Sequence, residues 1–514
     1  MTEIERLAGD VLCVGLPGEK LERATREALR ELQPGAIVLF SRNVTTLEAT
    51  RTLVDRACAA SCDALRPLIC VDQEGGRVAR LRFAENGVPA MLAVGAADDE
   101  TLAERVGARL GRDIAAVGGS VDFAPVLDLA LDAASTVIGT RSLGDDPARV
   151  AVLGAALVRG MAAVGIASVP KHFPGHGATA IDSHVAMPTI VTPAAVVSSR
   201  DCAPFVAAFA AGARAVMTAH AIIAEIDPDL PATLSPRILT ELLRDELRFR
   251  GVCFTDCLQM DAIARTVGTA RGAVLAIAAG ADSCIISGDL ALSRDARDAI
   301  VTAARDGTLA LDRLREAATR VRALREWCAE ATGAPARERD DLDDVPALVA
   351  ARAIVVIRGD VRLDLARPVT VVSFEDDVGD GVAATSGARP SLSSALRHRR
   401  VRSELLRVPR EPDVAMRAML CDVLAGQGSR ALVIVARRAH LFAAQRDAIA
   451  ELLAAAPHAI VVSALEPFDV PSFGDARALA CTFDDGEAAM EALADVLTSR
   501  TSATGRMPVT LAAS

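Results

Sequence analysis

The stretch Gly251-Val252-Cys253-Phe254-Thr255-Asp256-Cys257-Leu258-Gln259-Met260 has the form of one strand leading into one helix. Its apolar, β-branched run Val252–Thr255 predicts a short buried strand, and a helical pattern follows. Asp256 comes directly after the run, where an acid is costly unless it is paired or used. Because this order of features recurs along the first two-thirds of the chain, the unit indicates the architecture.

Seven further runs have the same character: Val11–Leu16, Ala36–Phe40, Pro67–Asp72, Val121–Ala124, Ile166–Val169, Ala213–Thr218 and Asp282–Ile286. Segments of helical period lie between them, among them Leu47–Cys58, Leu102–Ile114, Val150–Val164 and Ile238–Leu247. Eight strand–helix units in about 300 residues predict a parallel (β/α)8 TIM-type barrel. An open, doubly wound sheet is the alternative that periodicity alone leaves open.

The composition changes after Gly333, where a charged run with Pro and Gly is typical of a linker. A second α/β region follows, with strand-like runs at Ala353–Ile357, Val369–Phe374, Ala431–Ala436, Ala459–Ala464 and Leu479–Phe483. We therefore predict a catalytic TIM-type barrel over residues 1–333, a charged linker over 334–346, and an α/β sandwich domain over 347–514.

The overall composition is that of a globular protein, with 51% hydrophobic and 24% charged residues. The formal charge of −11 argues against nucleic acid or an anionic membrane as a partner. Met1–Arg6 carries acids where a secretory signal needs basic residues, and no apolar run reaches the ~18 residues of a membrane helix. The eleven scattered cysteines indicate buried thiols in a reducing compartment. We expect a cytoplasmic protein whose oligomeric state the sequence leaves open.

Unusual polar residues follow several of the predicted strands. Asp72 ends the third run, Lys171 and His172 follow the fifth, His220 follows the sixth, and Asp256 follows the seventh. In a parallel barrel the carboxyl ends of all strands open onto one face, which is built from the strand-to-helix loops. These side chains are therefore expected to gather at one rim.

The densest stretch of potential chemistry is Lys171-His172-Phe173-Pro174-Gly175-His176-Gly177-Ala178-Thr179-Ala180-Ile181-Asp182-Ser183-His184. Asp182 can hydrogen-bond the imidazole of His184, fix its tautomer and favour its protonated form. A histidine held in this way can act as a general acid and then as a general base. Lys171 supplies a fixed positive charge, whereas His176 is interpreted as a structural group of the turn.

Asp256 can serve as a nucleophile, because a carboxylate at a strand end faces the expected pocket. A helix cap is the alternative role for Asp256. Cys257 should point to the opposite face if the strand continues. A zinc site is a further alternative, with ligands from His172, His176, His184, His220 and Asp256. No cysteines are spaced as a ligand pair, and we predict neither a metal nor a cofactor.

Taken together, these residues resemble glycoside hydrolase family 3, and specifically the two-domain form of its bacterial β-N-acetylhexosaminidase branch. The matching pieces stand in the family's order and spacing across the predicted barrel: Val71–Arg77 with Arg80, Ile138–Ser142, Lys171–Gly177 with Asp182–His184, Met217–His220, Pro231–Ser235 and Phe254–Met260. The C-terminal region, with Gly505-Arg506-Met507-Pro508-Val509 near its end, resembles the α/β sandwich domain of longer members.

The resemblance implies roles for individual residues. Asp256 matches the family's nucleophile, and His184 matches its acid/base with Asp182 as partner. The positions that hold the sugar correspond to Asp72, Arg80, Arg141, Lys171 and His172. Ala178 and Cys257 depart from the family pattern, since many members have Asp at both positions, and this puts the fine substrate preference in doubt.

The implied activity is that of a retaining glycoside hydrolase without a cofactor. It would release terminal β-linked N-acetylglucosamine or N-acetylhexosamine from small glycosides, such as peptidoglycan-turnover or chitin-derived fragments, through a covalent glycosyl-Asp256 intermediate. The absence of Tyr and the single Trp favour a pocket for one small sugar. A phosphorylase that uses phosphate as acceptor, a β-glucosidase, a metal-dependent barrel hydrolase and an inactive sugar-binding protein are the alternatives; intact Asp256 and His184 argue against the last.

Overall fold

Each of the eight runs singled out in the sequence contains a strand. The computed structural model describes residues 1–61, 65–83, 87–179, 187–333, 342–375, 391–425 and 430–511. The strands of the first domain are β1 (Leu12–Gly15), β2 (Ala36–Leu39), β3 (Leu68–Val71), β6 (Val121–Asp122), β7 (Ala167–Ser168), β9 (Ala215–Met217), β11 (Val252–Phe254) and β12 (Cys284–Ile286).

These strands form a closed ring in which the pairings of neighbours are parallel. Six of them hydrogen-bond in the order β12-β1-β2-β3-β6-β7, and β9 pairs with β11. The ring continues where the Phe173 N–H donates to the Met217 carbonyl at 2.8 Å, and closes where the Thr255 N–H donates to the Ser283 carbonyl at 2.9 Å. The first domain is therefore a parallel barrel, and the open doubly wound sheet is excluded.

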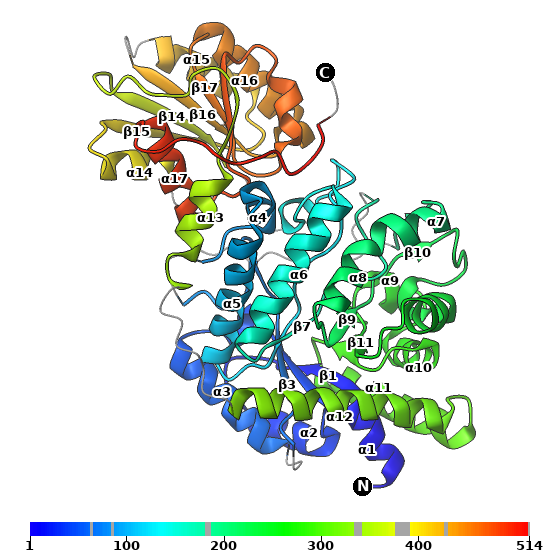
Figure 1. Ribbon diagram of the computed structural model, residues 1–514. Coiled ribbons are helices and arrows are strands. Elements are labelled where there is room, and N and C mark those ends of the chain that lie inside the picture. The colour runs from blue at the N-terminus through cyan, green and yellow to red at the C-terminus, as the bar shows by residue number, and fades with distance from the viewer. Residues whose placement is uncertain are drawn as a thin grey trace.

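Helices surround the barrel and cover the outer faces of its strands (Figure 1). Their apolar faces pack inward, as an amphipathic helix requires, and α5 lies along α6. They are α1 (Glu3–Asp10), α2 (Arg23–Leu32), α3 (Leu47–Ala60), α5 (Glu100–Ala116), α6 (Pro147–Ala163), α8 (Ala203–Ala210), a π-helical segment (Arg237–Glu246), α10 (Thr269–Ala279), α11 (Leu290–Asp306) and α12 (Leu311–Gly333).

Short elements lie within the loops between strands and helices. They include β4 (Gln73–Gly75), β5 (Val78–Ala79), α4 (Met91–Ala97), a 3-10 turn at Gly139–Arg141, β8 (Thr189–Ile190), α7 (Ala194–Val196), β10 (Ile222–Ile223) and α9 (Asp261–Ala264). The hairpin of β4 and β5 follows β3 directly, and the Gly139–Arg141 turn lies between β6 and α6. These loops carry most of the polar residues discussed below.

The second domain is built on one sheet with the strand order β13-β18-β17-β16-β14-β15. The strands run parallel except for β13, which is antiparallel to β18. Its elements are α13 (Val345–Ala353), β13 (Val355–Arg358), β14 (Val369–Phe374), α14 (Leu392–His398), β15 (Ser403–Val408), α15 (Val414–Ala425), β16 (Ala431–Ala436), α16 (Ala443–Ala455), β17 (Ile460–Ser463), β18 (Ala478–Cys481) and α17 (Glu487–Leu497). The prediction of an α/β chain with two sheet-containing domains is confirmed.

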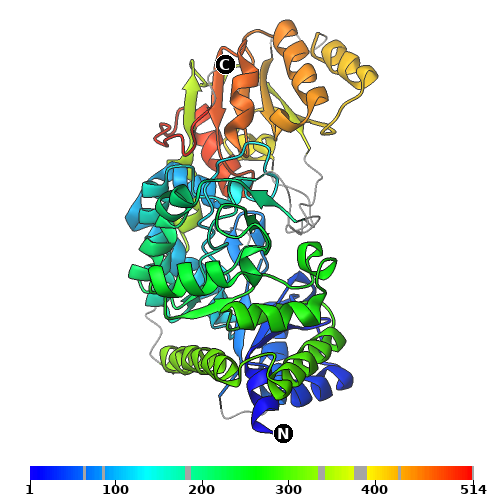
Figure 2. The same ribbon diagram turned by 90° about the vertical axis from the view of Figure 1, so that its right-hand side faces the viewer.

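Helix α13 joins the two domains. It packs on α4 and α5 of the first domain and on α17 of the second, and it lies between them in Figure 1. The view in Figure 2 shows the second domain stacked on one end of the first. Much of the predicted linker lies outside the described residues, while α13 already begins at Val345. The predicted domain limits stay predictions.

The described cysteines are free thiols, and Cys13, Cys70, Cys253 and Cys284 are buried, as the sequence led us to expect. Across the described ranges, helices of the length and apolar character needed to cross a membrane are absent.

Candidate active site

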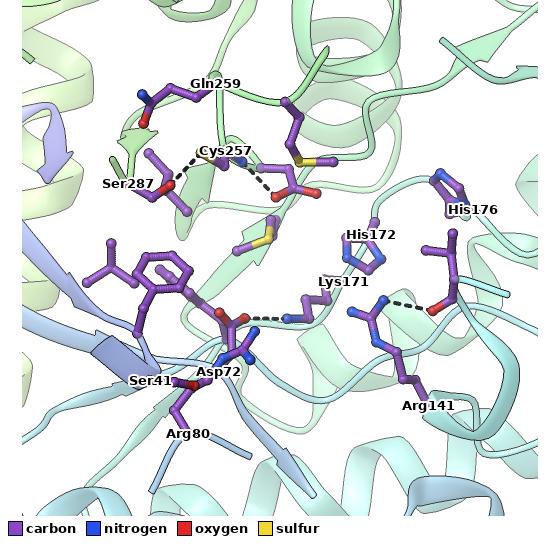
Figure 3. Close-up of a pocket in the computed structure, with 18 of the residues that line it drawn as sticks. Ser41, Asp72, Arg80, Arg141, Lys171, His172, His176, Cys257, Gln259 and Ser287 are labelled. Atoms are coloured by element: carbon purple, nitrogen blue, oxygen red, sulfur yellow. Dashed lines mark hydrogen bonds and ion pairs between the residues drawn. The ribbon is translucent and has the colours of Figure 1, made fainter. Parts of the chain in front are cut away.

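A cavity of about 540 Å³ opens at the carboxyl ends of the barrel strands. Figure 3 shows Asp72, Lys171 and Arg141 on one side of it, and Cys257, Gln259 and Ser287 on the other. The residues that line it come from β2, β3, β6, β7, β9, β11 and β12 or from the loops that follow them: Val38, Phe40, Ser41, Arg42, Asp72, Arg80, Phe123, Val137, Arg141, Lys171, His172, His176, Met217, Asp256, Cys257, Gln259, Met260, Asp261, Ile285 and Ser287.

Lys171 lies at the centre of a buried ion-pair network. Its Nζ is 2.7 Å from Asp72 Oδ1 and 2.6 Å from Glu74 Oε1, and its side chain is 3% exposed. Glu74 also accepts two hydrogen bonds from Arg141, from Nε at 2.8 Å and from Nη2 at 2.9 Å. This two-point contact fixes the plane of the guanidinium. Two cations and two carboxylates are thus held at one wall of the cavity.

The network keeps Glu74 and Lys171 charged. Burial by itself would raise the pKa of Glu74. The positive charges of Arg141 and Lys171 have the larger effect and hold this pKa far below its usual value. Burial would likewise lower the pKa of Lys171, yet Asp72 and Glu74 raise it. The wall therefore presents fixed charges that hydroxyl groups of a ligand can bind.

Asp128 anchors the two histidines of the loop after β7. Its Oδ2 accepts from the backbone N–H of His172 at 3.1 Å and lies 2.6 Å from His172 Nδ1, while Oδ1 accepts from the His176 N–H at 2.6 Å. Burial raises the pKa of Asp128, but the two histidines lower it by more, so the carboxylate stays ionised. Nδ1 of His172 therefore carries a proton and donates it in the hydrogen bond to Asp128.

His176 lines the cavity but is almost fully buried, at 2% exposed. Within the described part of the chain, neither of its ring nitrogens has a hydrogen-bond partner. Burial lowers the pKa of His176 to about 4, against the opposing effects of Asp128 and Asp256. The ring is therefore neutral at neutral pH.

Asp256 enters the cavity from the end of β11. The backbone N–H of Cys257 donates to its Oδ1 at 2.6 Å, which orients the carboxylate. The expectation that Cys257 points away from the cavity is wrong, because Cys257 lines the same cavity. Strand β11 ends at Phe254, so the alternation of side chains along a strand no longer applies at 256 and 257. Burial raises the pKa of the Cys257 thiol, which makes it a poor nucleophile.

His220 does not belong to the cavity wall. Its Nδ1 lies 2.7 Å from Thr233 Oγ1 and its Nε2 lies 3.0 Å from the Cys257 carbonyl. Both nitrogens are thus engaged, one by a side-chain hydroxyl and the other by the backbone next to Asp256, and His220 is not placed as a zinc ligand. Among the described residues, a cluster of three His, Cys, Asp or Glu side chains with the geometry of a metal site is absent.

The structure brings six of the residues singled out in the sequence to one cavity: Asp72, Arg80, Arg141, Lys171, His172 and Asp256. Asp182 and His184 lie outside the described residues. Sequence reasoning missed Glu74 and Asp128, which hold Arg141 and His172 in place. Asp128 could have been found by the argument used for Asp72, since it also stands as a lone acid in an apolar run, whereas Glu74 has no such context.

A carboxylate on one wall and fixed cations and acids on the other suit a small, neutral, hydroxyl-rich ligand. The volume of the cavity lies within the usual range for small-molecule sites. The fold and the site thus define a barrel enzyme of the glycosidase class.

Comparison with known proteins identifies the family. Residues 4–324 match the model of the glycosyl hydrolase family 3 N-terminal domain. This match spans more than half of the chain, and the protein belongs to glycoside hydrolase family 3. The family resemblance noted in the sequence is confirmed, and the protein is a glycosidase.

Individual relatives are similar over one or both domains. A β-hexosaminidase from Pseudomonas aeruginosa is 42% identical over 286 residues, which cover 54% of this chain and 83% of that protein. A β-hexosaminidase from Stenotrophomonas maltophilia is 41% identical over 261 residues, 49% of this chain and 76% of that protein. The structure of a family 3 β-N-acetylglucosaminidase from a Paenibacillus species is 33% identical, covers 99% of both chains and has a TM-score of 0.93.

Proposed function

We propose that the protein is a retaining β-N-acetylhexosaminidase that releases terminal β-linked N-acetylglucosamine, or a related N-acetylhexosamine, from small glycosides. The observation that carries the proposal is the convergence of Asp256 with Asp72, Arg141 and Lys171 on one cavity of about 540 Å³. The β-hexosaminidases at 42% and 41% identity, and the β-N-acetylglucosaminidase at 33%, support the same substrate class.

In this proposal Asp72, Arg80, Arg141, Lys171 and His172 bind the sugar. Asp72 accepts hydrogen bonds from hydroxyl groups, while Lys171 and Arg141 donate them. The ion pairs with Glu74 and Asp72 hold both cations before the sugar enters. Less conformational freedom is then lost on binding, which favours affinity and correct placement of the anomeric carbon.

Asp256 is proposed as the nucleophile. One carboxylate oxygen forms a bond to the anomeric carbon as the bond to the leaving oxygen breaks, and protonated His184 gives its proton to that oxygen. Neutral His184 then takes a proton from water, which attacks the anomeric carbon and releases Asp256. Two inversions give net retention. His184 and its partner Asp182 are assigned from the sequence alone.

The natural substrates that fit this proposal are peptidoglycan-turnover fragments or chitin-derived oligosaccharides, each with a terminal N-acetylhexosamine. A cavity in the size range of small-molecule sites supports action on chain ends rather than along a polysaccharide. We expect no cofactor, no nucleic-acid partner and a cytoplasmic location.

The test is hydrolysis of p-nitrophenyl β-N-acetylglucosaminide and p-nitrophenyl β-glucoside by the wild type, Asp256→Ala and Asp261→Asn. Asp261 also lines the cavity and pairs with Arg265 at 3.1 Å, so it is a matched carboxylate control. We expect acetamido-selective release that falls on the order of 10³-fold or more in Asp256→Ala and changes little in Asp261→Asn. Full activity of Asp256→Ala contradicts the assignment of the nucleophile.

The same assay separates the alternative functions. Each enzyme is measured with and without phosphate, and with and without a chelator. Release that requires phosphate and yields a sugar 1-phosphate identifies a phosphorylase. Equal or faster release from the plain glucoside identifies a β-glucosidase, and loss of activity on chelation identifies a metal-dependent hydrolase.

A further inference from the structure

Two buried carboxylates of the second domain lie directly behind the loops that carry Arg141 and Glu74. Glu466 follows β17 and Asp484 follows β18, so both stand at the carboxyl ends of neighbouring parallel strands. Glu466 is 2% exposed and Asp484 is 6% exposed. The described residues that line the cavity all belong to the first domain, so these two acids reach the site only through its loops.

Glu466 contacts the turn that ends in Arg141. Its Oε1 accepts a hydrogen bond from the Thr140 N–H at 3.3 Å, and its Oε2 accepts one from Arg438 Nε at 3.0 Å. Gly139 has a φ of +42°, and a Cβ at this position would overlap Glu466 Oε1. Only glycine allows both this backbone conformation and this close approach. The turn is therefore seated on the second domain immediately before Arg141.

Asp484 contacts the segment that supports Glu74. Its Oδ1 accepts from the Ala90 N–H at 3.1 Å, and its Oδ2 accepts from the Gly486 N–H at 2.9 Å. Ala90 packs so closely on Gly76 that a Cβ there would lie 2.7 Å from the Ala90 Cα. Gly76 follows Glu74 by two residues, and its N–H donates to the Val88 carbonyl at 2.8 Å. Asp484 thus holds the other side of the Glu74–Arg141 pair.

The two acids also share one charged partner, Arg77. Burial raises the pKa of Glu466, but Arg438 and Arg77 lower it by more, so this acceptor is ionised. A carboxylate that accepts from a backbone N–H makes a stronger hydrogen bond than a neutral group. Arg77, in the loop that follows Glu74, acts on Asp484 as well.

We propose that Glu466 and Asp484 are positioning residues for the sugar-binding wall. They hold the two loops that place Arg141 and Glu74, and the second domain thereby sets the geometry of a cavity that it does not line. The inference rests on the proposed role of Arg141 in binding the sugar. A small displacement of such a group lowers kcat/KM, mainly by weakening the binding of the sugar that Arg141 holds in place.

The test is a double-mutant cycle on p-nitrophenyl β-N-acetylglucosaminide. We expect Glu466→Gln to lower kcat/KM about tenfold or more, mainly through KM, and to change kcat/KM less than twofold in the background of Arg141→Ala. If the loss in kcat/KM of the double variant equals the product of the losses of Glu466→Gln and Arg141→Ala, the two residues act independently and the inference is overturned. Arg506→Gln is the matched control, because Arg506 pairs with Asp98 across the domains at 3.0 Å, at the opposite end of α4 from Ala90. It should retain wild-type kinetics.

Hydrogen exchange and a second variant, Gly139→Ala, test the same contact without relying on the activity of Glu466→Gln. Hydrogen exchange at residues 137–143 should be faster in Glu466→Gln than in Arg506→Gln, and equal exchange overturns the inference even if the wild type proves inactive on this substrate. Gly139→Ala disturbs the same contact from the barrel side while it keeps both Glu466 and Arg438. If Glu466→Gln fails to fold, Gly139→Ala takes its place in the cycle. We expect Gly139→Ala to show the same loss in kcat/KM, and to show it only when Arg141 is present. Wild-type activity of Gly139→Ala overturns the inference.

Discussion

His176 should make the stability of the protein depend on pH. Burial lowers its pKa from 6.5 to about 4. Between these values the unfolded chain binds a proton that the folded chain does not, so stability is full above pH 6.5 and falls as the pH decreases. Relative to His176→Gln, the wild type should lose about 2 kcal/mol of unfolding free energy between pH 7.5 and pH 5. Urea unfolding at both pH values measures this.

The control for this prediction is His398→Gln, because His398 is exposed and pairs with Glu491 at the surface. It should keep the pH dependence of the wild type. If the unfolding free energy of His176→Gln depends on pH as it does in the wild type, His176 does not cause the loss of stability at low pH.

Single residues of the site could be predicted when their own sequence context was unusual. Asp72, Lys171, His172 and Asp256 each follow an apolar run, and the structure places them on one cavity. The roles of Glu74 and Asp128 could be understood only with their partners, which lie 67 residues away at Arg141 and 44 residues away at His172. A sequence pattern gives no direct sign of such pairs.

Asp282 should be the main polar support between β11 and β12. Its Oδ2 accepts from the Cys253 N–H at 3.0 Å and from Arg244 Nη2 at 2.6 Å, and its Oδ1 lies 3.1 Å from Arg320 Nη1. The side chain is fully buried, so Asp282→Asn leaves the buried Arg244 and the partly buried Arg320 facing a neutral group. We expect a loss of about 3 kcal/mol in unfolding free energy, measured by urea unfolding. The variant Asp306→Asn, at an exposed position, should unfold at nearly the same urea midpoint as the wild type, and the same result for Asp282→Asn would refute this role.

Strands and helices of the barrel could be predicted because both faces of its strands are buried, which leaves continuous apolar runs. Strand β15 was missed for the opposite reason. It forms the edge of the second sheet, its side chains are largely half-exposed, and it carries Glu404 and Arg407 among its apolar residues. Cys257 was misplaced because the end of β11 falls before Thr255, and strand ends are set by contacts that the local sequence does not show.

At the scale of the molecule, the sequence predicted two sheet-containing domains but not how they meet. The contacts of Glu466 with Thr140 and of Asp484 with Ala90 join residues that are 326 and 394 positions apart. They depend on the fit of two folded surfaces, and nothing in the hydrophobic pattern of either segment indicates them.

The chain should unfold in one cooperative transition, because its apolar core does not stop at the boundary between the domains. One cluster of buried residues includes Leu102 in α5, Val349 in α13 and Leu479 in β18. The only tryptophan, Trp327, lies in α12 with the Arg214 guanidinium 4.4 Å over its ring, so its fluorescence reports on the barrel alone. Far-ultraviolet circular dichroism reports on both domains. The two probes should give the same urea midpoint, as two-state unfolding requires. If part of the ellipticity is lost at a lower urea concentration than the one at which the fluorescence changes, the second domain unfolds independently. Its contacts with the barrel would then be weaker than this continuous core implies.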